Sequence, residues 1–397
     1  MPNTHEQTTP DVSASLLLLF ATGTGLAVAT LYYNQPMLAV IGLHLHASPS
    51  ALGWIPTLTQ LGYAAGILFL APLGDRHDRR SVILIKGVVL ILALLGAAYS
   101  PSIALLGAAS FLIGLSATLA QDIVPAAAHI APAAKRGRIV GKVMTGLLLG
   151  ILLSRVVSGL VAAQAGWRTM FLIAAASITV FWLIAWRRLP AFEPTTRLNY
   201  RALLASLGHL WIRHSLLRRA AIAQGFLSLA FGGFWSTLAV MLHAAPFHLN
   251  SAAAGAYGLA GAAGALAAPL AGRFADHGGP ERVTRVGAAL VAVSFTALFA
   301  LPWSPVPVYL TLIAISSIGF DLGIQSSLIA HQSIIYGLDH DARGRLTAIL
   351  VTAMFIGMAI GSALSSILLE QIGWLGVVGF AVFSGLAALA TRLWPGA

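Results

Sequence analysis

Twelve long apolar runs follow one another along the chain, and they constrain its fold more than any other feature of the sequence. A helix of about 20 apolar residues crosses a bilayer core, whereas a membrane barrel strand has about 10 residues and alternates polar with apolar side chains. Only 9% of the 397 residues are charged, against about 25% in soluble domains. The runs lie near residues 14–40, 51–73, 81–99, 103–128, 139–163, 168–187, 219–243, 252–274, 284–301, 306–330, 345–368 and 374–393. We therefore expect an all-α integral membrane protein with twelve transmembrane helices.

Basic side chains outside these runs are confined to alternate connections, apart from Arg168. The connections near 41–50, 100–102, 244–251, 302–305 and 369–373 contain no lysine or arginine, and those between them contain arginine clusters. Because basic loops stay in the cytoplasm, we expect both termini on the cytoplasmic side of a bacterial inner membrane. The net charge of +11 then reflects topology and contact with the anionic headgroups of the lipid bilayer, and no nucleic-acid partner is expected.

The sequence carries no signature of an enzyme or of a disulfide-bonded protein. It has no cysteine and no HExxH, GxSxG or Walker loop, so we expect no catalysis, no metal and no cofactor. Residues 1–13 contain no lysine or arginine, and the first run is too long for the apolar region of a signal peptide. We therefore expect no cleavable signal.

Internal repeats divide the chain into two parts. Asp75 and Asp276 match at an offset of 201, and Gly150 and Gly357 match at an offset of 207. Arg136-Gly137-Arg138 matches Arg343-Gly344-Arg345 at the same offset of 207. Several matches at one offset indicate two parallel repeats. We expect pseudo-symmetric six-helix bundles at 1–187 and 219–397, packed around a central cavity.

The connection at 188–218 is expected to be a cytoplasmic linker that contains a helix. Its apolar residues Leu203, Leu207, Leu210 and Trp211 recur at helical spacing among arginines. This pattern predicts an amphipathic helix on the inner leaflet, either as a plain connector or as a binding element for a partner.

A ten-residue motif follows the second run. It reads Ala71-Pro72-Leu73-Gly74-Asp75-Arg76-His77-Asp78-Arg79-Arg80, and its second copy keeps Gly272, Asp276 and Gly279. With the two six-helix halves and GWRTMF at the start of the sixth run, it resembles the signature Gly-x-Leu-x-Asp-Arg-x-Gly-Arg-Arg of the major facilitator superfamily. Ala71 and Asp78 stand where the signature has glycine. YYNQPML at 32–38 resembles the bacterial drug and sugar efflux branch. The resemblance implies two halves that rock around a central site.

The same motif predicts a cytoplasmic gate. A carboxylate at a helix end can be held by arginines and by a neighbouring helix dipole when that side of the protein is shut. The gate residues that we expect are Asp75, Arg76, Arg79, Arg80, Asp122 and Asp276. We expect Asp122, near the end of the fourth run, to accept a hydrogen bond from Arg79. The alternative is a solvated loop that only sets topology.

Two charged residues, Arg155 and Asp321, lie deep inside predicted spans. Ionisable residues in spans are costly and usually functional. At 1.5 Å per residue each lies roughly 24 Å from the start of its helix, so both should face a wet cavity or a partner. Lys86 and Lys142 lie near cytoplasmic helix ends, from which they are expected to snorkel.

Arg155 departs from the resemblance. Efflux members that exchange substrate for protons carry a Gly-Pro pair in the fifth helix, where this chain has Ser154-Arg155. A fixed positive charge can hold an anionic substrate or serve as counter-ion to a carboxylate; a structural ion pair or a cap to backbone carbonyls is the alternative. We expect Arg155 to face the cavity and to couple, directly or through substrate, to Asp321.

Asp321 is the candidate proton carrier. Its proton affinity would change if rocking moved it between a dry environment and the neighbourhood of an arginine. Direct substrate binding and a structural hydrogen bond are the alternatives. Gln325 is one turn further along the same helix face and is expected to bind substrate. His331 could relay protons, but near a helix end we expect it to be exposed.

Further polar residues are expected to line the cavity. Asn34 and Gln35 precede Pro36, which frees a backbone carbonyl and bends the first helix. Gln60, Gln224 and Trp235 are either cavity residues or part of a helix seam. Small residues let helices approach closely in lipid, and such pairs are Gly62 and Gly66, Gly146 and Gly150, Gly357 and Gly361, with Gly255, Gly258, Gly261 and Gly264 recurring in the eighth run. They predict either the rocking interface or ordinary packing within one half.

These features favour a monomeric, proton-coupled efflux transporter for a small organic solute. A second interpretation is a facilitator or proton symporter that imports a small organic anion held by Arg155. A third is a membrane sensor or partner subunit that transports nothing. A cavity with one arginine and one aspartate suits sugars, nucleosides, amphipathic drugs or organic acids, so the substrate stays open.

Overall fold

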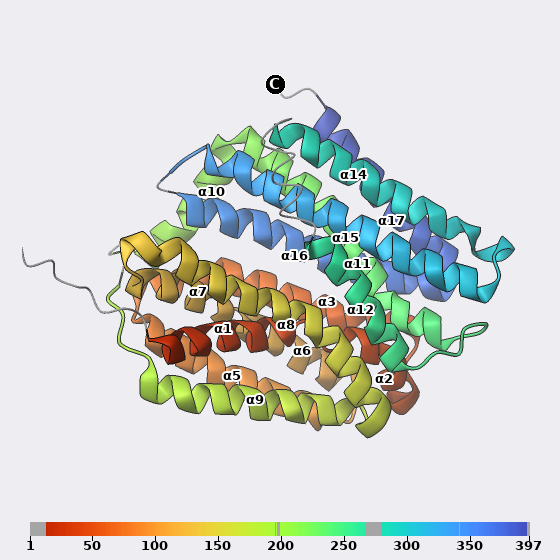
Figure 1. Cartoon of the computed structure of the whole chain (residues 1–397), viewed down its shortest axis with the longest axis horizontal. Helices are drawn as coiled ribbons and strands as arrows, with labels where there is room; N and C mark the ends of the chain where they lie inside the picture. The colour runs from red at the N-terminus through yellow and green to blue at the C-terminus, as the bar shows by residue number, and fades with distance from the viewer. Residues whose placement is uncertain (1–12, 195, 197–198, 267–278, 341, 395–397) are drawn as a thin grey trace, which may run out of the picture.

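The computed structural model describes residues 13–194, 196, 199–266, 279–340 and 342–394, which form helices joined by short connections (Figure 1). The first half contains α1 Ala14–Ala29, α2 Leu38–Leu45, α3 Pro49–Ala65, α4 Ala71–Arg76, α5 Arg79–Ala98, α6 Ile103–Ala117, α7 Leu119–Ile130, α8 Arg136–Ala165 and α9 Trp167–Arg188. The second half contains α11 Ser215–His243, α12 Ser251–Leu266, α14 Pro280–Thr296, α15 Val306–Tyr336, α16 Arg343–Gln371 and α17 Trp374–Leu393, and α10 Tyr200–Arg213 joins the two halves.

The predicted spans are present as helices. Ten helical segments of the described chain are long and apolar enough to cross a membrane. The first predicted span is divided into α1 and α2 by a short 3₁₀ turn, Gln35–Met37. The eighth begins as α12, and its continuation at 267–278 lies outside the described residues. The all-α fold with two six-helix bundles is thereby confirmed.

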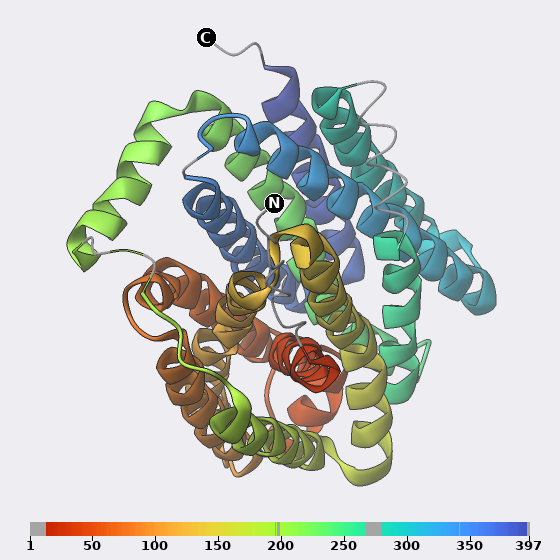
Figure 2. The same ribbon diagram turned by 60° about the vertical axis from the view of Figure 1, so that its left-hand side comes forward.

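The two bundles lie side by side. In Figure 1 the first half, red to yellow-green, occupies the lower part of the molecule and the second half, green to blue, the upper part; the rotated view in Figure 2 keeps them apart. Corresponding turns repeat: Gly166 before α9 and Gly373 before α17 both have φ +86°, a conformation that favours glycine. The pseudo-symmetry read from the sequence therefore extends to backbone geometry.

Glycine contacts inside each half repeat in the same way. A Cβ on Gly146 or Gly150 of α8 would lie 2.2 Å from a backbone oxygen of α1. A Cβ on Gly357 or Gly361 of α16 would lie 2.3 or 2.1 Å from a backbone oxygen of α11. These pairs, like Gly62 against α6, pack helices within one half rather than at the interface between halves.

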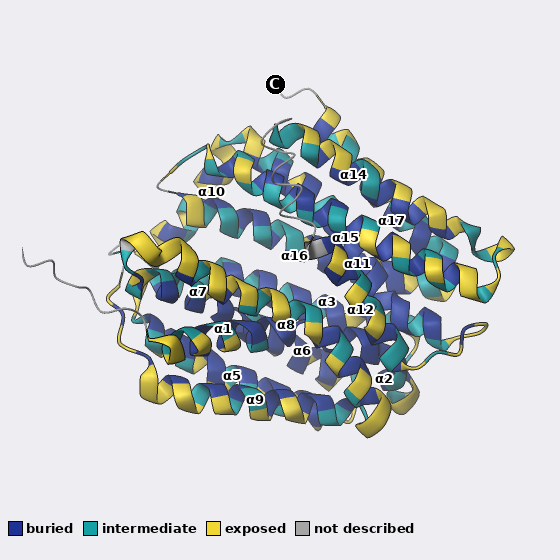
Figure 3. Ribbon diagram, viewed as in Figure 1, coloured by how far each residue is buried: buried dark blue, intermediate teal, exposed yellow. Residues whose placement is uncertain are grey.

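The outer surface is apolar, as a lipid-facing surface must be. Large apolar side chains are exposed along the outer helices, among them Ile85, Leu92, Val180, Val293 and Phe383, which are 57–66% exposed. Figure 3 shows the exposed residues on the outward faces and the buried ones between helices. In water such a surface would aggregate, so its natural surroundings are lipid.

The two ends of the molecule differ in how closely the halves approach. We call the end where α1 begins and α17 ends the terminal end, and the end with the α2–α3 and α16–α17 connections the far end. Near the far end Ser50 donates its backbone N–H to Glu370 Oε2 at 2.8 Å, and Thr57 Oγ1 donates to the Ala359 carbonyl at 3.2 Å. At the terminal end a cavity of about 560 Å³ separates α4 and α7 from α16. The halves are thus shut at the far end and apart at the terminal end.

The linker helix α10 packs on protein through the predicted stripe. Leu203, Leu207 and Leu210 are buried, and the last two belong to a cluster with residues of α11, α15 and α16. Trp211 is 36% exposed. The helix ends at Arg213, and α11 begins at Ser215, before the predicted 219. Arg218 and Arg219 therefore belong to α11. The bundle limits at 187 and 219 stay predictions.

Candidate functional site

The break in the first span places three polar side chains in the interior of the protein. From Thr30 to Met37 the backbone hydrogen bonds include several between residues three apart, such as those from Tyr32 to Ala29 and from Met37 to Asn34. Pro36 lacks an N–H to continue the α-helix. All residues of this break are buried, and a broken helix of this kind brings irregular backbone to the middle of a transporter. Tyr32, Asn34 and Gln35 therefore point their side chains into the protein interior.

Arg155, in the middle of α8, is buried at 4% exposure. Its Nε donates to Gln35 Oε1 at 2.8 Å. Its guanidinium carbon lies 4.8 Å from the ring centre of Tyr32 and 4.3 Å from that of Trp235, close enough for cation–π attraction. The ring of Phe231 is 5.5 Å away. A cation that would be costly in lipid is thus surrounded by aromatic rings from both halves.

Asp321, in the middle of α15, reaches the same cluster from the other side. It is 4% exposed, and its carboxylate lies beside Gly261 of α12. The glycine face of α12 makes this approach possible. A Cβ on Gly261 would lie 2.1 Å from Asp321 Oδ2 and 2.8 Å from Trp235, and a Cβ on Gly258 would lie 2.9 Å from Arg155 Cβ. Glycine at these positions leaves room for both charged side chains.

Several polar atoms of this central cluster have no hydrogen-bond partner among the described residues. They are Arg155 Nη2, Asp321 Oδ1 and Gln35 Nε2. Leaving a buried donor or acceptor unpaired costs about 1–3 kcal/mol, and native proteins keep few of them. The cluster therefore offers donors and an acceptor to a further polar group, such as a solute, a proton or water.

The other predicted cavity residues are less closely grouped. Asn34 Nδ2 donates to Thr59 Oγ1 of α3 at 3.1 Å. Gln60 is fully buried, and neither end of its amide has a partner in the described chain. Gln325 is half-buried on α15. Tyr32 and Phe231 were not predicted as site residues. Tyr32 could have been found from its position two residues before Asn34, whereas Phe231 resembles any other apolar residue of a span.

His331 is fully buried, so the prediction that it is exposed is wrong. Its Nδ1 lies 3.0 Å from Gln224 Oε1. The tenth span continues to Tyr336, beyond the predicted end at 330, and this extra length covers the histidine. Gln224 thus pairs with His331 inside the second half rather than with Arg155.

The predicted gate residues lie at the terminal end, and one of their predicted contacts is absent. Arg79 Nη2 donates to Asp75 Oδ1 at 2.5 Å, and Arg79 Nε donates to the Gly74 carbonyl at 2.8 Å. Arg80 Nη2 donates to the Trp186 carbonyl at 2.7 Å. Arg76 is exposed, and Asp276 lies outside the described residues. The motif therefore ties its own loop to α4 and α9.

Asp122 does not accept from Arg79 as predicted. Lys86 Nζ donates to Asp122 Oδ2 at 2.6 Å, and both side chains are at least 94% buried. The expectation that Lys86 snorkels to the surface is therefore also wrong. The rotation of a helix about its axis decides whether a lysine faces lipid or the interior, and Asp122 on α7 supplies a partner inside the bundle.

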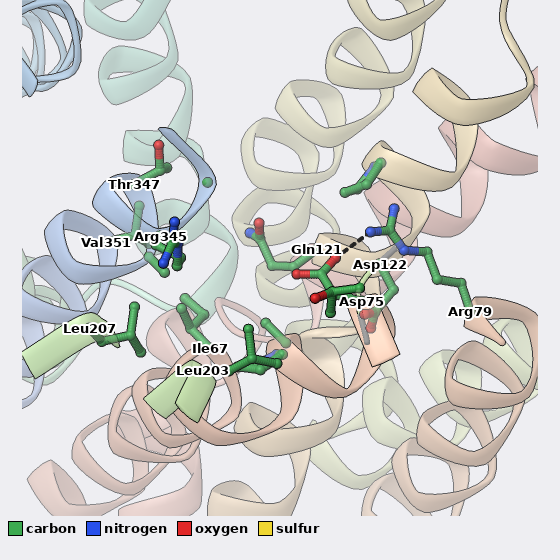
Figure 4. A pocket seen from close by; sticks show the side chains of 16 residues that line it. Ile67, Asp75, Arg79, Gln121, Asp122, Leu203, Leu207, Arg345, Thr347 and Val351 are labelled. Atoms are coloured by element: carbon green, nitrogen blue, oxygen red, sulfur yellow. Dashed lines mark hydrogen bonds and ion pairs between the residues drawn. The ribbon is translucent and has the colours of Figure 1, made fainter. Parts of the chain in front are cut away.

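The cavity at the terminal end lies between the two halves. Figure 4 shows Asp75, Arg79, Gln121 and Asp122 on one side, Arg345, Thr347 and Val351 of α16 on the other, and Leu203 and Leu207 of α10 along its edge. Its volume of about 560 Å³ is within the range of small-molecule sites. The space opens toward the terminal end, where the halves are apart.

Comparison with known proteins agrees with this architecture. The Major Facilitator Superfamily profile matches residues 18–336. The uncharacterized transporter YgaY of Escherichia coli O157:H7 is 42% identical over 367 residues, 92% of either chain. A probable transporter of Streptomyces coelicolor is 34% identical over 95% of this chain and 87% of its own. A D-xylose transporter of Levilactobacillus brevis is 28% identical over 171 residues, 42% of this chain and 35% of its own.

Solved structures share the fold at low sequence identity. The nucleoside transporter NupG has a TM-score of 0.75 at 16% identity, covering 95% of this chain and 99% of that one. The xylose transporter XylE of E. coli, partially occluded and inward open, has a TM-score of 0.71 at 16% identity, covering 96% and 99%. The chain therefore belongs to the major facilitator superfamily and has the fold of a secondary transporter that works by alternating access.

Proposed function

We propose that the chain is a proton-coupled transporter that exports a small organic solute across the bacterial inner membrane. One observation carries the proposal: Arg155 and Asp321, from different halves, are both buried against the glycine face of α12. Buried charges in a membrane protein are costly and mark substrate or proton pathways. Asp321 is the group that can gain and lose a proton, whereas an arginine stays charged.

The solute contacts Arg155 and its neighbours in this proposal. Two donors, Arg155 Nη2 and Gln35 Nε2, have no partner among the described residues, and Trp235 and Tyr32 supply ring faces. Asn34, Gln224 and Gln325 stay predicted substrate contacts. The protein acts as a monomer, since both charges come from one chain.

The sidedness of the proposal follows the arginine-rich loops. They place the terminal end and both termini in the cytoplasm. The cavity at that end is then where a solute enters from the cell, and Asp75, Arg79, Arg80 and Asp122 belong to the gate that shuts behind it. Asp321 takes up a proton when the site faces outward and releases it when the site faces inward.

Proton movement in everted membrane vesicles tests this proposal. Sugars, nucleosides, amphipathic amines and organic acids are added in turn to vesicles with the wild type, with Asp321→Asn, or with Glu193→Gln as a matched control on the exposed connector. We expect one solute class to move protons in the wild type and in the control, and none in Asp321→Asn. Solute transport at the wild-type rate in Asp321→Asn, still coupled to protons, would contradict the role of Asp321.

Proton-coupled or facilitated import of a small organic anion is the second candidate. The unpartnered Nη2 of Arg155 suits a carboxylate, and the partial likeness to a D-xylose transporter is consistent with uptake. Uptake of radiolabelled organic acids into whole cells separates the two: accumulation that Arg155→Ala abolishes favours import over export.

A further inference from the structure

Arginines from three helices come together where α14 begins and α17 ends, at the terminal end of the second half. Arg392, in the last turn of α17, donates from Nη2 to Glu281 Oε1 in the first turn of α14. On the other side of this chain end, Arg219 of α11 donates to the Trp394 carbonyl at 2.7 Å. Two further arginines follow Glu281 on α14. We call the four residues the arginine cluster: Arg219, Arg282, Arg285 and Arg392.

The carboxylate bonded to this cluster compensates its charge only in part. Glu281 brings one negative charge against the four positive charges of the arginines. Arg392 is 1% exposed, and its Nε and Nη1 have no hydrogen-bond partner among the described residues. The Oε2 atom of Glu281 is buried without such a partner as well. Because a buried charge that is incompletely paired is costly, a further anion beside the cluster would be stabilising.

Away from the arginine cluster, α14 and α17 present apolar stripes on the outer surface. Val286 and Val293 of α14 are exposed and seven residues apart, and Leu386 and Leu393 of α17 are exposed at the same spacing. Residues seven apart share one face of a helix. The two helices pack directly against each other, so the stripes are neighbours. This surface is therefore charged at the helix ends and apolar along the helices, which is the arrangement of polar and apolar parts in a phospholipid.

Arg285 lies at the edge of the seam between α14 and α17. It is one helical turn from Glu281 and two turns from Ala292, and residues at such spacing share a face. A Cβ on Gly385 of α17 would lie 2.9 Å from the Ala292 nitrogen, so this face of α14 meets α17. The Arg285 side chain is nonetheless exposed, as is that of Arg282. Both guanidinium groups are thus accessible where the seam ends.

We propose that the second half binds an anionic phospholipid here, in the leaflet at the terminal end. The phosphate lies against Arg282 and Arg285, and the acyl chains lie along the apolar stripes of α14 and α17. Arginine binds phosphate oxygens through several N–H donors, and basic pockets between transmembrane helices bind lipid headgroups. Trp394, exposed beside the cluster, is of the residue type enriched at the headgroup level. The inference goes beyond the proposed function, because it involves neither the solute nor the coupled proton.

A free phosphate ion would offer the same oxygens to the arginines. It would leave the apolar stripes of α14 and α17 without a partner, whereas a phospholipid covers both parts of the surface. Burial of acyl chains along the stripes adds to the attraction of the phosphate, at about 0.8 kcal/mol for each buried CH₂ group. The lipid should therefore bind at concentrations at which inorganic phosphate does not.

Native mass spectrometry of the full chain in detergent tests the proposal by counting bound lipids. The protein is titrated with phosphatidylglycerol or with phosphatidylcholine, and inorganic phosphate is then added as a competitor. The test variant carries Arg282→Gln with Arg285→Gln. The matched control carries Arg136→Gln with Arg138→Gln, which removes the same charge from two exposed positions at the start of α8. Thermal unfolding of each protein with and without phosphatidylglycerol gives a second measurement.

We expect phosphatidylglycerol to bind the wild type and the control about 30-fold more tightly than the test variant, because each basic residue near a membrane surface contributes a factor of about 5. Phosphatidylcholine, whose choline cation offsets its phosphate, should bind the wild type more weakly. Phosphatidylglycerol should raise the unfolding temperature of the wild type and the control more than that of the test variant.

Three results would overturn the proposal. Equal losses in the test variant and the control would show a general attraction of charge rather than a site. Equal binding of the two lipids would show that the negative charge is not recognised. Displacement of phosphatidylglycerol by inorganic phosphate would identify a site for a free anion. If the test variant does not fold, Arg285→Gln alone should still weaken binding about 5-fold.

Discussion

Glu370 joins the two halves at the far end by accepting the backbone N–H of Ser50 on its Oε2 at 2.8 Å. Ser50 lies in the first turn of α3, where N–H groups have no partner inside the helix and a carboxylate is favoured. This contact was not predicted, although Ser48 and Pro49 signal a helix start. The contact must break when the far end opens.

We expect Glu370→Ala to open the far end only modestly, because Glu370 is exposed and water screens its contact. The chain contains no cysteine, so spin labels on Tyr99→Cys in the first half and Trp303→Cys in the second, 73% and 82% exposed, measure the distance between the halves at the far end. Glu193→Ala, which removes an exposed carboxylate in the connector, should have no effect. An unchanged distance in Glu370→Ala would mean that other contacts, such as that of Thr57 with the Ala359 carbonyl, hold the far end shut.

Gly261→Ala should abolish solute-driven proton movement while leaving the protein folded. The new Cβ would lie 2.1 Å from Asp321 Oδ2 and 2.8 Å from Trp235, so the carboxylate must move away from Arg155. Overpacking of this kind costs about 1–3 kcal/mol. The control is Gly141→Ala in α8, which meets nothing within 4 Å. Vesicle assays and size-exclusion profiles compare the two; normal transport by Gly261→Ala would mean that the position of Asp321 is not critical.

Removing one member of the Lys86–Asp122 pair should destabilise the first half. Both groups are buried, and breaking a buried ion pair costs about 3–5 kcal/mol. Lys86→Gln or Asp122→Asn alone leaves the other charge unpaired. The double variant forms a neutral amide pair and should recover much of the loss. Unfolding in detergent by chemical denaturant gives the values; equal losses in the single and double variants would show that the two groups contribute independently.

His331→Leu should lower stability but leave proton coupling intact. The change leaves the buried Gln224 Oε1 without the nitrogen that lies 3.0 Å away, at a cost of about 1–3 kcal/mol. Replacing Gln224 by leucine as well should restore stability, because both polar partners are then gone. Loss of solute-driven proton movement in a stable His331→Leu protein would instead place this histidine on the proton path.

Features set by residues close together in the sequence could be predicted, whereas contacts between side chains of different helices could not. Span number, bundle symmetry and the depth of Arg155 and Asp321 follow from local composition and 1.5 Å of rise per residue, and the first two are confirmed. The meeting of those two residues stays a prediction, because it depends on how three helices are rotated about their axes. The predicted contact of Arg79 with Asp122 and the predicted snorkelling of Lys86 are wrong for the same reason: the sequence alone does not tell which face of a helix meets lipid and which meets its neighbours.

The linker helix α10 has a mechanical consequence for the terminal end. Tyr200 at its start donates to the Phe69 carbonyl of the first half at 2.9 Å, whereas Leu207 and Leu210 pack with α11 and α16 of the second. Because α10 is attached to both halves, it limits how far the halves can separate along that edge. Opening and closing of the terminal-end cavity, which Leu203 and Leu207 of α10 line, therefore has to take place with this helix attached to both halves.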